Sequence, residues 1–217
     1  MKTALIFGST GLIGNNLLDI ILQNNHYDHI KLFVRSVTEN NNSKVEIIHT
    51  DFDHLEKHKD SIVGEDCFFC IGTTRKNTPD KSQYTRIEYN IPIEVAKIAK
   101  SNSVNNFIYV SSLGANPNAA GLYLKNKGKA EEELKKLNFT KLSIIRPSIL
   151  LGNRKENRVG EKIGILLMKT LSPLFLGKLK KYKPIKVENV AKAMVNISQN
   201  NYQKVTFESD QLLEISN

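Results

Sequence analysis

Three residues with the side chains needed for acid–base chemistry on a carbonyl oxygen lie close together in the sequence: Ser112, Tyr123 and Lys127. Tyr123 and Lys127 are four residues apart on a segment predicted to be helical, so they share one face of it. A phenol has a pKa of about 10, and a neighbouring ammonium group favours the phenolate and lowers that pKa. The tyrosine can then pass a proton to or from a substrate oxygen. A serine hydroxyl would stabilise charge on the same oxygen, and Ser111 is the alternative to Ser112 for that role.

The Tyr-x-x-x-Lys pattern by itself is weak evidence, because it occurs at three places: Tyr27–Lys31, Tyr123–Lys127 and Tyr182–Lys186. The first match spans a loop and the start of a strand, and the last contains Pro184, which breaks a helix. The middle match is the one on a predicted helix that follows a strand ending in two serines. The alternative for this pair is side-by-side packing on an exposed helix face.

A glycine-rich turn at the start of the chain is predicted to bind a phosphate group. Gly8, Gly11 and Gly14 follow an apolar strand and open an amphipathic helix. Glycine permits a close approach of the backbone, and the free N–H groups and dipole of a helix N-terminus attract anions. No Gly-Lys-Ser/Thr follows, which argues against a nucleoside-triphosphate loop. The alternative is a turn that binds nothing.

Apolar runs alternate with helical patterns along the chain. The predicted strands are Thr3–Phe7, Ile30–Val34, Val45–Ile48, Cys67–Ile71, Asn106–Val110 and Leu142–Arg146. The predicted helices are Gly11–Gln23, Ile91–Ser101, Ala119–Leu137, Lys162–Leu171 and Val187–Ser198. This alternation predicts an α/β fold: a doubly wound, mostly parallel sheet covered on both faces. We expect one domain over residues 1–217, with residues 151–185 forming a small C-terminal cap on the substrate side.

The residues after each predicted strand are candidates for the site, because ligands of such sheets bind beyond the carboxyl ends of the strands. Arg35 follows the second strand, where an NAD-binding site would carry an acidic residue for the ribose. A guanidinium group suits a 2′-phosphate instead, so we expect NADP(H) in preference to NAD(H); the alternative is a surface arginine. Asp51 and Phe52 follow the third strand and are expected at the adenine. Gly72 follows the fourth strand and permits a close backbone approach.

Two clusters of metal-binding residue types are predicted to hold no metal. Cys67 and Cys70 form a C-x-x-C on a predicted strand, where positions three apart point to opposite faces, so we expect two separate core thiols. His54 and His58 form H-x-E-x-H, with the glutamate misplaced relative to the H-E-x-x-H of zinc proteases.

The chain has a formal net charge of +9. The densest basic stretch contains Lys178, Lys180, Lys181, Lys183 and Lys186. A solvated face is the favoured interpretation. The alternatives are a rim that attracts an anionic substrate and a weak nucleic-acid patch, which the lack of an aromatic ladder disfavours. No apolar segment reaches membrane-spanning length and no cleavable signal is recognised, so we expect no membrane partner and a cytoplasmic location.

These motifs together resemble the short-chain dehydrogenase/reductase superfamily, specifically its extended or atypical branch. The stretches most like the Tat-interacting-protein oxidoreductases and their bacterial relatives begin at Cys70, Ser111, Leu122 and Arg154. The resemblance implies a Rossmann-type fold, catalytic Ser112, Tyr123 and Lys127, and a segment from Arg146 to Ile149 whose backbone lies against the nicotinamide. The expected cofactor-binding residues are therefore Gly8, Ser9, Thr10, Gly11, Leu12, Ile13, Gly14, Arg35, Ser36, Asp51, Phe52, Ile71, Gly72, Thr73, Ser111, Tyr123, Lys127, Pro147 and Ile149.

The chain differs from the extended branch in one respect that narrows the expected class of substrates. About seventy residues follow Pro147, too few for the sizeable substrate domain of many extended members. This disfavours their nucleotide-sugar substrates. Arg154, Arg158 and Glu161 are expected either to close the site or to form an exposed charged loop.

Three functions are consistent with the sequence. The first is an NADP(H)-dependent oxidoreductase acting on a carbonyl/alcohol pair, with a monomer or a homodimer through helices Ile91–Ser101 and Ala119–Leu137 as its assembly. The second is an NADP(H)-sensing regulator that binds a partner protein without turnover, which the short cap favours. The third and weakest is a nucleic-acid binder using the basic stretch, with strongly salt-dependent affinity.

Overall fold

The computed structural model describes residues 1–36, 39–152 and 177–217. Within this part of the chain, seven strands form one sheet in the order β3-β2-β1-β4-β5-β6-β9, and every neighbouring pair is parallel. The strands are β1 (Thr3–Phe7), β2 (His29–Val34), β3 (Val45–His49), β4 (Asp66–Phe69), β5 (Asn106–Val110), β6 (Lys141–Arg146) and β9 (Thr206–Glu208).

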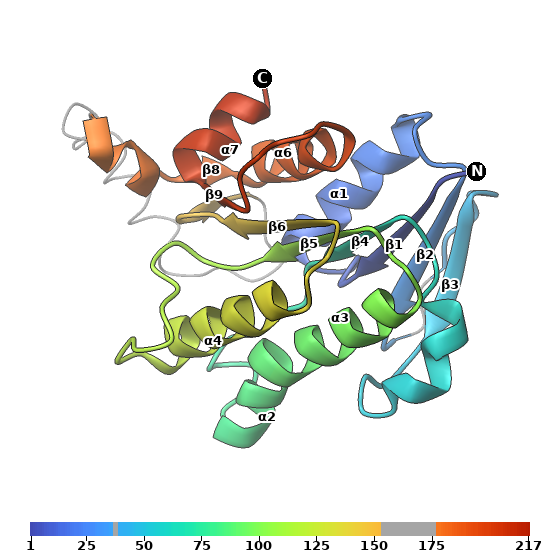
Figure 1. Ribbon diagram of the computed structural model, residues 1–217, viewed down its shortest axis with the longest axis horizontal. Coiled ribbons are helices and arrows are strands. Elements are labelled where there is room, and N and C mark those ends of the chain that lie inside the picture. The colour runs from blue at the N-terminus through green and yellow to red at the C-terminus, as the bar shows by residue number, and fades with distance from the viewer. Residues whose placement is uncertain (37–38, 153–176) are drawn as a thin grey trace.

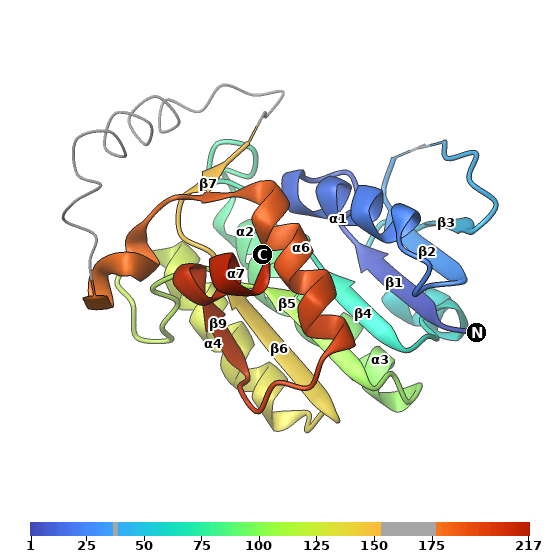
Figure 2. The ribbon, with the colours of Figure 1, turned by 90° about the horizontal axis from the view of Figure 1, so that it is seen from above.

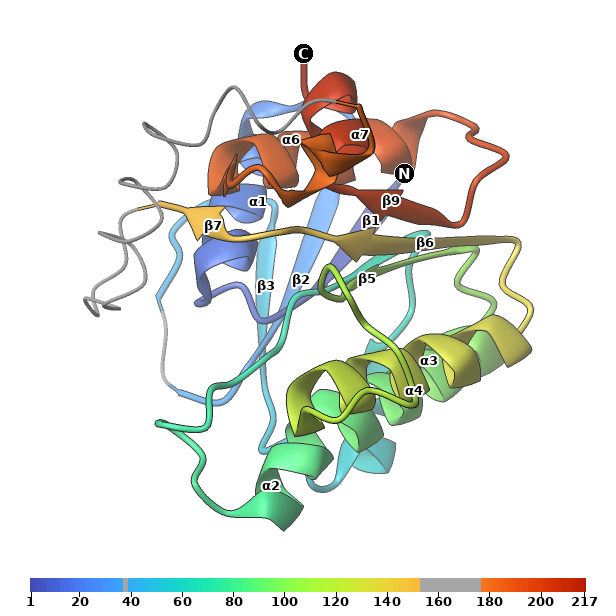
Figure 3. The ribbon, with the colours of Figure 1, turned by 90° about the vertical axis from the view of Figure 1, so that its left-hand side faces the viewer.

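Helices cover both faces of this sheet (Figure 1). They are α1 (Leu12–Gln23), α2 (Lys81–Thr85), α3 (Ile91–Ser101), α4 (Leu122–Lys136), α6 (Val187–Gln199) and α7 (Ser209–Ile215). Helices α1, α6 and α7 lie on one face, and α3 and α4 lie on the other (Figure 3). From above, α6 runs beside α1 and α7 lies against α6 (Figure 2).

The strands are apolar on both sides because each face packs against helices. In β1, Ala4 and Ile6 contact the core under α1 and α6, whereas Leu5 and Phe7 contact the core under α3. On the second face, Phe7 stacks on Phe33 of β2 with ring centroids 4.2 Å apart. This two-sided burial explains why the sequence shows continuous apolar runs instead of an alternating pattern.

From β1, the chain first adds β2 and β3 on one side of the sheet and then returns to add β4, β5 and β6 on the other side. The order of the strands therefore reverses between β1 and β4. In a parallel sheet, the crevice outside the carboxyl ends at such a reversal is where ligands bind. The turn after β1 and the loop after β4 (residues 70–80) therefore lie next to each other at the carboxyl ends of the strands. The candidate site lies at these carboxyl ends.

The predicted fold class is confirmed, with differences at its margins. Helix α4 starts at Leu122 instead of Ala119, because Gly121 is extended and Ala119 belongs to a turn closed by Asn116. Strand β9 and helix α7 went unpredicted, since β9 has three residues and one apolar side chain to signal it. A second small sheet pairs β7 (Leu150–Leu151) with β8 (Ile185–Lys186).

Some predictions fall on residues outside the description. The predicted helix Lys162–Leu171, the charged group Arg154, Arg158 and Glu161, and most of the expected cap are among them. Among the described residues, no helix is long and apolar enough to cross a membrane.

Candidate functional site

The turn between β1 and α1 has room for nothing larger than glycine at two positions. Gly8 has a φ of +90°, a conformation that side chains disfavour. A Cβ on Gly14 would lie 2.1 Å from the carbonyl oxygen of Gly8, so glycine there lets the helix pack directly on the turn. Gly11 closes the turn by donating its N–H to the Gly8 oxygen at 3.0 Å. These contacts give the three glycines a local structural reason.

The start of α1 presents polar groups that suit an anion. Its N-cap, Gly11, offers no side chain to the first-turn N–H groups, and no acidic residue lies in that first turn. Ser9 is buried, and its Oγ is without a hydrogen-bond partner among the described residues. Leu12 and Ile13 open the helix, and Thr10 is exposed beside it. Free backbone donors and an orphaned hydroxyl at a helix N-terminus fit a pyrophosphate.

Tyr123 and Lys127 lie one turn apart on α4, but in different surroundings. Tyr123 is 38% exposed, whereas Lys127 is 3% exposed. The Lys127 ammonium donates to the Val110 carbonyl at 2.9 Å and forms an ion pair with Glu88 at 3.0 Å. Burial is the largest single effect on the pKa of Lys127 and lowers it, but Glu88, Tyr109 and Tyr123 together raise that pKa more, so the net pKa lies above its ordinary value. Lys127 is therefore a fixed, buried cation beside an accessible phenol.

The two serines after β5 also differ in their surroundings. Ser111 is buried and donates its hydroxyl to Glu131 at 2.5 Å. Glu131 is in turn held by Arg146, whose Nε donates to it at 2.9 Å. Ser112 is half-buried, and its hydroxyl has one long contact, at 3.4 Å, to the Leu113 carbonyl. Ser112 thus retains a hydroxyl that can turn toward a ligand, and Ser111 has a structural partner.

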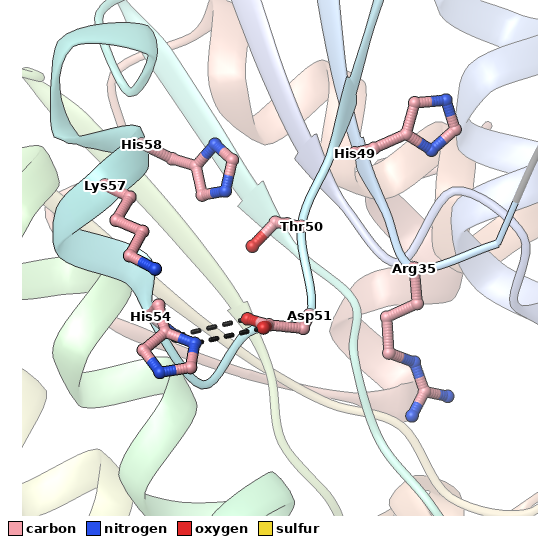
Figure 4. A pocket seen from close by; sticks show the side chains of 7 residues that line it. All are labelled: Arg35, His49, Thr50, Asp51, His54, Lys57 and His58. Carbon is pink, nitrogen blue, oxygen red and sulfur yellow. Dashed lines mark hydrogen bonds and ion pairs between the residues drawn. The ribbon is translucent and has the colours of Figure 1, made fainter.

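A hollow with a volume of about 290 Å³ lies at the carboxyl ends of β2 and β3 (Figure 4). The lining residues are Arg35, His49, Thr50, Asp51, His54, Lys57 and His58. Asp51 lies between Arg35 and the side chains of the 3₁₀-helical turn η1 (Leu55–Ser61). His54 hydrogen bonds to the Asp51 carboxylate at 3.0 Å; this bond and backbone N–H donors lower the pKa of Asp51 to about 2. Two cations, three imidazoles and one carboxylate therefore line the hollow.

Phe52 contributes to this region mainly through its backbone. Its side chain is buried and packs toward Phe7, with ring centroids 6.3 Å apart. Its backbone is left-handed, with a φ of 64°, and its carbonyl accepts a hydrogen bond from Arg86 at 2.8 Å. Of the expected adenine pair, Asp51 therefore lines the hollow, whereas Phe52 packs into the core.

The remaining predicted residues lie at neighbouring strand ends. Ile71, Gly72 and Thr73 follow β4, and the Thr73 N–H donates to Glu88 at 2.6 Å. Pro147 follows β6, and its carbonyl accepts from the Leu113 N–H at 2.9 Å. Three further predicted residues near the carboxyl ends of the strands are exposed, namely Arg35, Ser36 and Ile149.

Sequence reasoning missed Glu88, Tyr84 and Arg75. Glu88 and Tyr84 are buried, and the Arg75 guanidinium lies 5.4 Å from the centre of the Tyr84 ring. Glu88 lies in a polar stretch that gave no sign of burial, and its partners come from two distant segments. A single buried acid has no local sequence signal.

The cysteines pack in different parts of the core. Cys67 contacts the core under α3, and Cys70 contacts the core under α1 and α6, as expected for opposite faces of a strand. Burial raises the pKa of the Cys70 thiol to about 12, with the Lys127 cation opposing this effect. Among the described residues, no group of three His, Cys, Asp or Glu could hold a metal ion.

A parallel sheet in this order, with a glycine-rich turn feeding a helix at the reversal point, defines a Rossmann-type nucleotide-binding protein. The chain belongs to the NAD(P)H-binding family, whose model matches residues 8–201. The resemblance to extended and atypical short-chain dehydrogenases/reductases is confirmed, and the chain shares its fold with solved sugar-nucleotide epimerases.

Two relatives and two solved structures illustrate the family. Protein FMP52, mitochondrial, from Debaryomyces hansenii is 34% identical over 203 residues, covering 90% of this chain and 87% of its own. Protein HTATIP2 from Rattus norvegicus is 32% identical over 166 residues, covering 74% and 67%. UDP-N-acetylglucosamine 4-epimerase from Methanobrevibacter ruminantium shares the fold with a TM-score of 0.68 at 17% identity, covering 95% of this chain and 76% of its own. UDP-glucuronic acid 4-epimerase from Bacillus cereus, in complex with NAD, has a TM-score of 0.68 at 13% identity, covering 98% and 80%.

The expected cytoplasmic location is wrong by comparison with these relatives. The FMP52 proteins of several yeasts that match this chain carry the word mitochondrial in their names. The expectation rested on the lack of a recognised signal, and composition alone does not distinguish these compartments.

Proposed function

We propose that this protein is an NADP(H)-dependent oxidoreductase of the short-chain dehydrogenase/reductase type that interconverts a carbonyl compound and an alcohol. The observation that carries the proposal is an exposed tyrosine one helical turn from a buried ammonium group, Tyr123 and Lys127, near the carboxyl edge of the sheet. The half-buried hydroxyl of Ser112 on the next strand end supports it.

The cofactor would be held by groups at the reversal of the sheet. The N–H groups at the start of α1, together with the Ser9 hydroxyl, would bind the pyrophosphate. Arg35 and Lys57, which line the hollow beyond β2 and β3, would bind a 2′-phosphate. When bound, the nicotinamide supplies or accepts a hydride.

The protein's own residues would handle the proton. In the direction of reduction, the Tyr123 hydroxyl gives its proton to the carbonyl oxygen as that oxygen becomes an alcohol, and the phenolate regains a proton from solvent. Ser112 donates a hydrogen bond to the same oxygen while charge develops on it. The Lys127 cation stabilises the phenolate across the helical turn.

The substrate class is a small carbonyl or alcohol compound, and an anionic one fits best. Arg75 is exposed on the loop after β4, with its guanidinium over the ring of Tyr84. An ionised Tyr123 would help to raise the pKa of Tyr84, so this cation is near the reacting groups. A guanidinium group there would attract a carboxylate or phosphate on the substrate.

Titration of the purified protein with NADPH and with NADH, followed by reduced-nicotinamide fluorescence, tests the cofactor assignment. We expect NADPH to bind at least about tenfold more tightly, since a lost charge-assisted contact is worth about 1.5–3 kcal/mol. In Arg35→Ala, NADPH affinity should fall to the level of NADH. Equal affinities in the wild type would contradict the NADP preference, and binding of neither nucleotide would contradict the whole proposal.

A panel of carbonyl compounds, with and without a carboxylate, then tests turnover. Tyr123→Phe should retain NADPH binding and lower turnover by about 10²–10⁴-fold. Binding of NADPH without turnover of any panel member by the wild type would favour the sensing function instead.

A further inference from the structure

Glu88 is a buried acid near the proposed site, with 1% of its surface exposed. It lies on η2 (Arg86–Asn90), a single π-helical turn between α2 and α3. Such turns are rare and occur often at functional sites. The proposed reaction gives Glu88 no role, so its burial calls for a separate explanation.

Glu88 joins two segments that come from different strand ends. Its Oε1 accepts a hydrogen bond from the Thr73 N–H at 2.6 Å, and its Oε2 lies 3.0 Å from the Lys127 ammonium. A Cβ on Gly72 would lie 3.4 Å from Oε1, so the backbone of this loop passes close to the carboxylate. One side chain therefore fixes both the loop after β4 and the buried lysine of α4.

The charge balance around Lys127 depends on the same residue. The groups that interact with the ammonium are Glu88 from η2, Tyr84 from α2, Cys70 and Tyr109 from the ends and interior of β4 and β5, and Tyr123 from α4. Burial raises the pKa values of Tyr84 and Cys70 to about 12 and raises that of Tyr109, so these groups are neutral near pH 7. Among these described groups around Lys127, Glu88 is the one that carries a negative charge near pH 7.

We propose that Glu88 is a positioning residue that couples the loop at Gly72 and Thr73 to Lys127 and compensates the lysine's charge beside Tyr123. This inference rests on the proposed function for its catalytic meaning, but the coupling itself is a property of the protein without substrate. Glu88 acts through Lys127 and the Thr73 backbone and needs no contact with substrate or cofactor.

The substitution Glu88→Gln tests the charge, because an amide keeps the shape of the side chain and one oxygen acceptor. With the carboxylate gone, burial disfavours the Lys127 cation and the pKa of Lys127 falls, so Lys127 no longer stabilises the Tyr123 phenolate at alkaline pH. We expect the midpoint of Tyr123 ionisation to rise by about one pH unit. Ultraviolet absorbance of phenolate follows this ionisation, with Tyr123→Phe in each background to isolate its signal.

The matched control is Glu133→Gln, which removes a half-buried acid from α4, the helix of Tyr123 and Lys127, where it pairs with Lys136 at 2.7 Å. The control should leave the Tyr123 titration unchanged. A Tyr123 midpoint that is the same in Glu88→Gln and the wild type would overturn the proposal, even if Glu88→Gln were less stable.

A second measurement keeps the test decisive if Glu88→Gln folds poorly. Glu88→Asp retains the charge, but its shorter side chain cannot reach both partners at the present distances. We expect the Thr73 amide to exchange with solvent at least about tenfold faster in Glu88→Asp, as one lost hydrogen bond to a charged group implies. Unchanged exchange would overturn the coupling. The two proposals fail separately, since NADPH binding and the Tyr123 titration are independent readouts.

Discussion

At the residue scale, two adjacent serines illustrate how burial assigns different roles to the same side chain. Ser111 completes a buried chain of contacts from its hydroxyl to Glu131 and on to Arg146. Removing one partner from such a chain exposes the others to the cost of an unpaired buried group. Ser112, one position further from the end of β5, retains a half-buried hydroxyl.

This contrast predicts opposite phenotypes for two alanine substitutions. Ser111→Ala should lower the free energy of unfolding by about 1–3 kcal/mol, because Glu131 loses a donor. Ser112→Ala should change that free energy by about 0.5 kcal/mol or less and lower turnover by about 10²-fold. Urea unfolding and carbonyl reduction by NADPH measure the two effects. The reverse pattern would reassign the substrate-orienting role to Ser111.

At the scale of elements, the glycine turn fixes the position of α1 against β1. The ideal Cβ on Gly14 would overlap the Gly8 carbonyl oxygen, so any side chain there must displace the helix or the turn. The same turn holds the uncapped N-terminus that the proposed pyrophosphate would contact. Cofactor affinity and the packing of α1 therefore depend on one geometry.

Gly14→Ala should destabilise the fold by about 3 kcal/mol and abolish measurable NADPH binding, because overpacking at the turn moves the backbone donors. Gly121→Ala is the matched control. Gly121 precedes α4 in an extended conformation, and nothing lies within 4 Å of the position of its Cβ. Chemical unfolding and nicotinamide fluorescence of both variants check this expectation, and normal NADPH affinity in Gly14→Ala would contradict it.

At the scale of the whole molecule, the two ends of the sheet carry different polar groups. The carboxyl ends hold the proposed site. The amino ends hold a buried cluster in which Asp66 accepts a hydrogen bond from the Tyr27 hydroxyl at 2.6 Å and pairs with Lys2 at 3.0 Å. Asn106 also donates to Asp66, at 2.9 Å. This cluster ties the first strand to the centre of the sheet and has no part in the proposed reaction.

Asp66→Ala separates stability from function across the molecule. The substitution leaves the Lys2 ammonium and two buried polar groups without their acceptor, so the free energy of unfolding should fall by about 3–5 kcal/mol. NADPH affinity of the folded fraction should stay at the wild-type value, because the site lies at the opposite end of the strands. Loss of affinity in a folded Asp66→Ala protein would show that the two ends are coupled.

The class of this protein follows from local patterns in its sequence. The six longer strands, the helices α1, α3, α4 and α6, and the glycine turn at Gly8 could be predicted, because each depends on neighbours in the chain: apolar runs, helical spacing and backbone freedom. The pairing of Tyr123 with Lys127 could be predicted for the same reason, since i and i+4 share a helix face.

The groups that contact these predicted residues are set by the tertiary structure. Glu88 meets Lys127 across 39 positions of sequence. His54 and His58 line the same hollow as Arg35, which follows another strand, and β9 pairs with β6. Burial also separated Ser111 from Ser112, which no local pattern distinguishes. Contacts between distant segments are set by the packing of the whole sheet, and their partners leave no periodic trace in the chain.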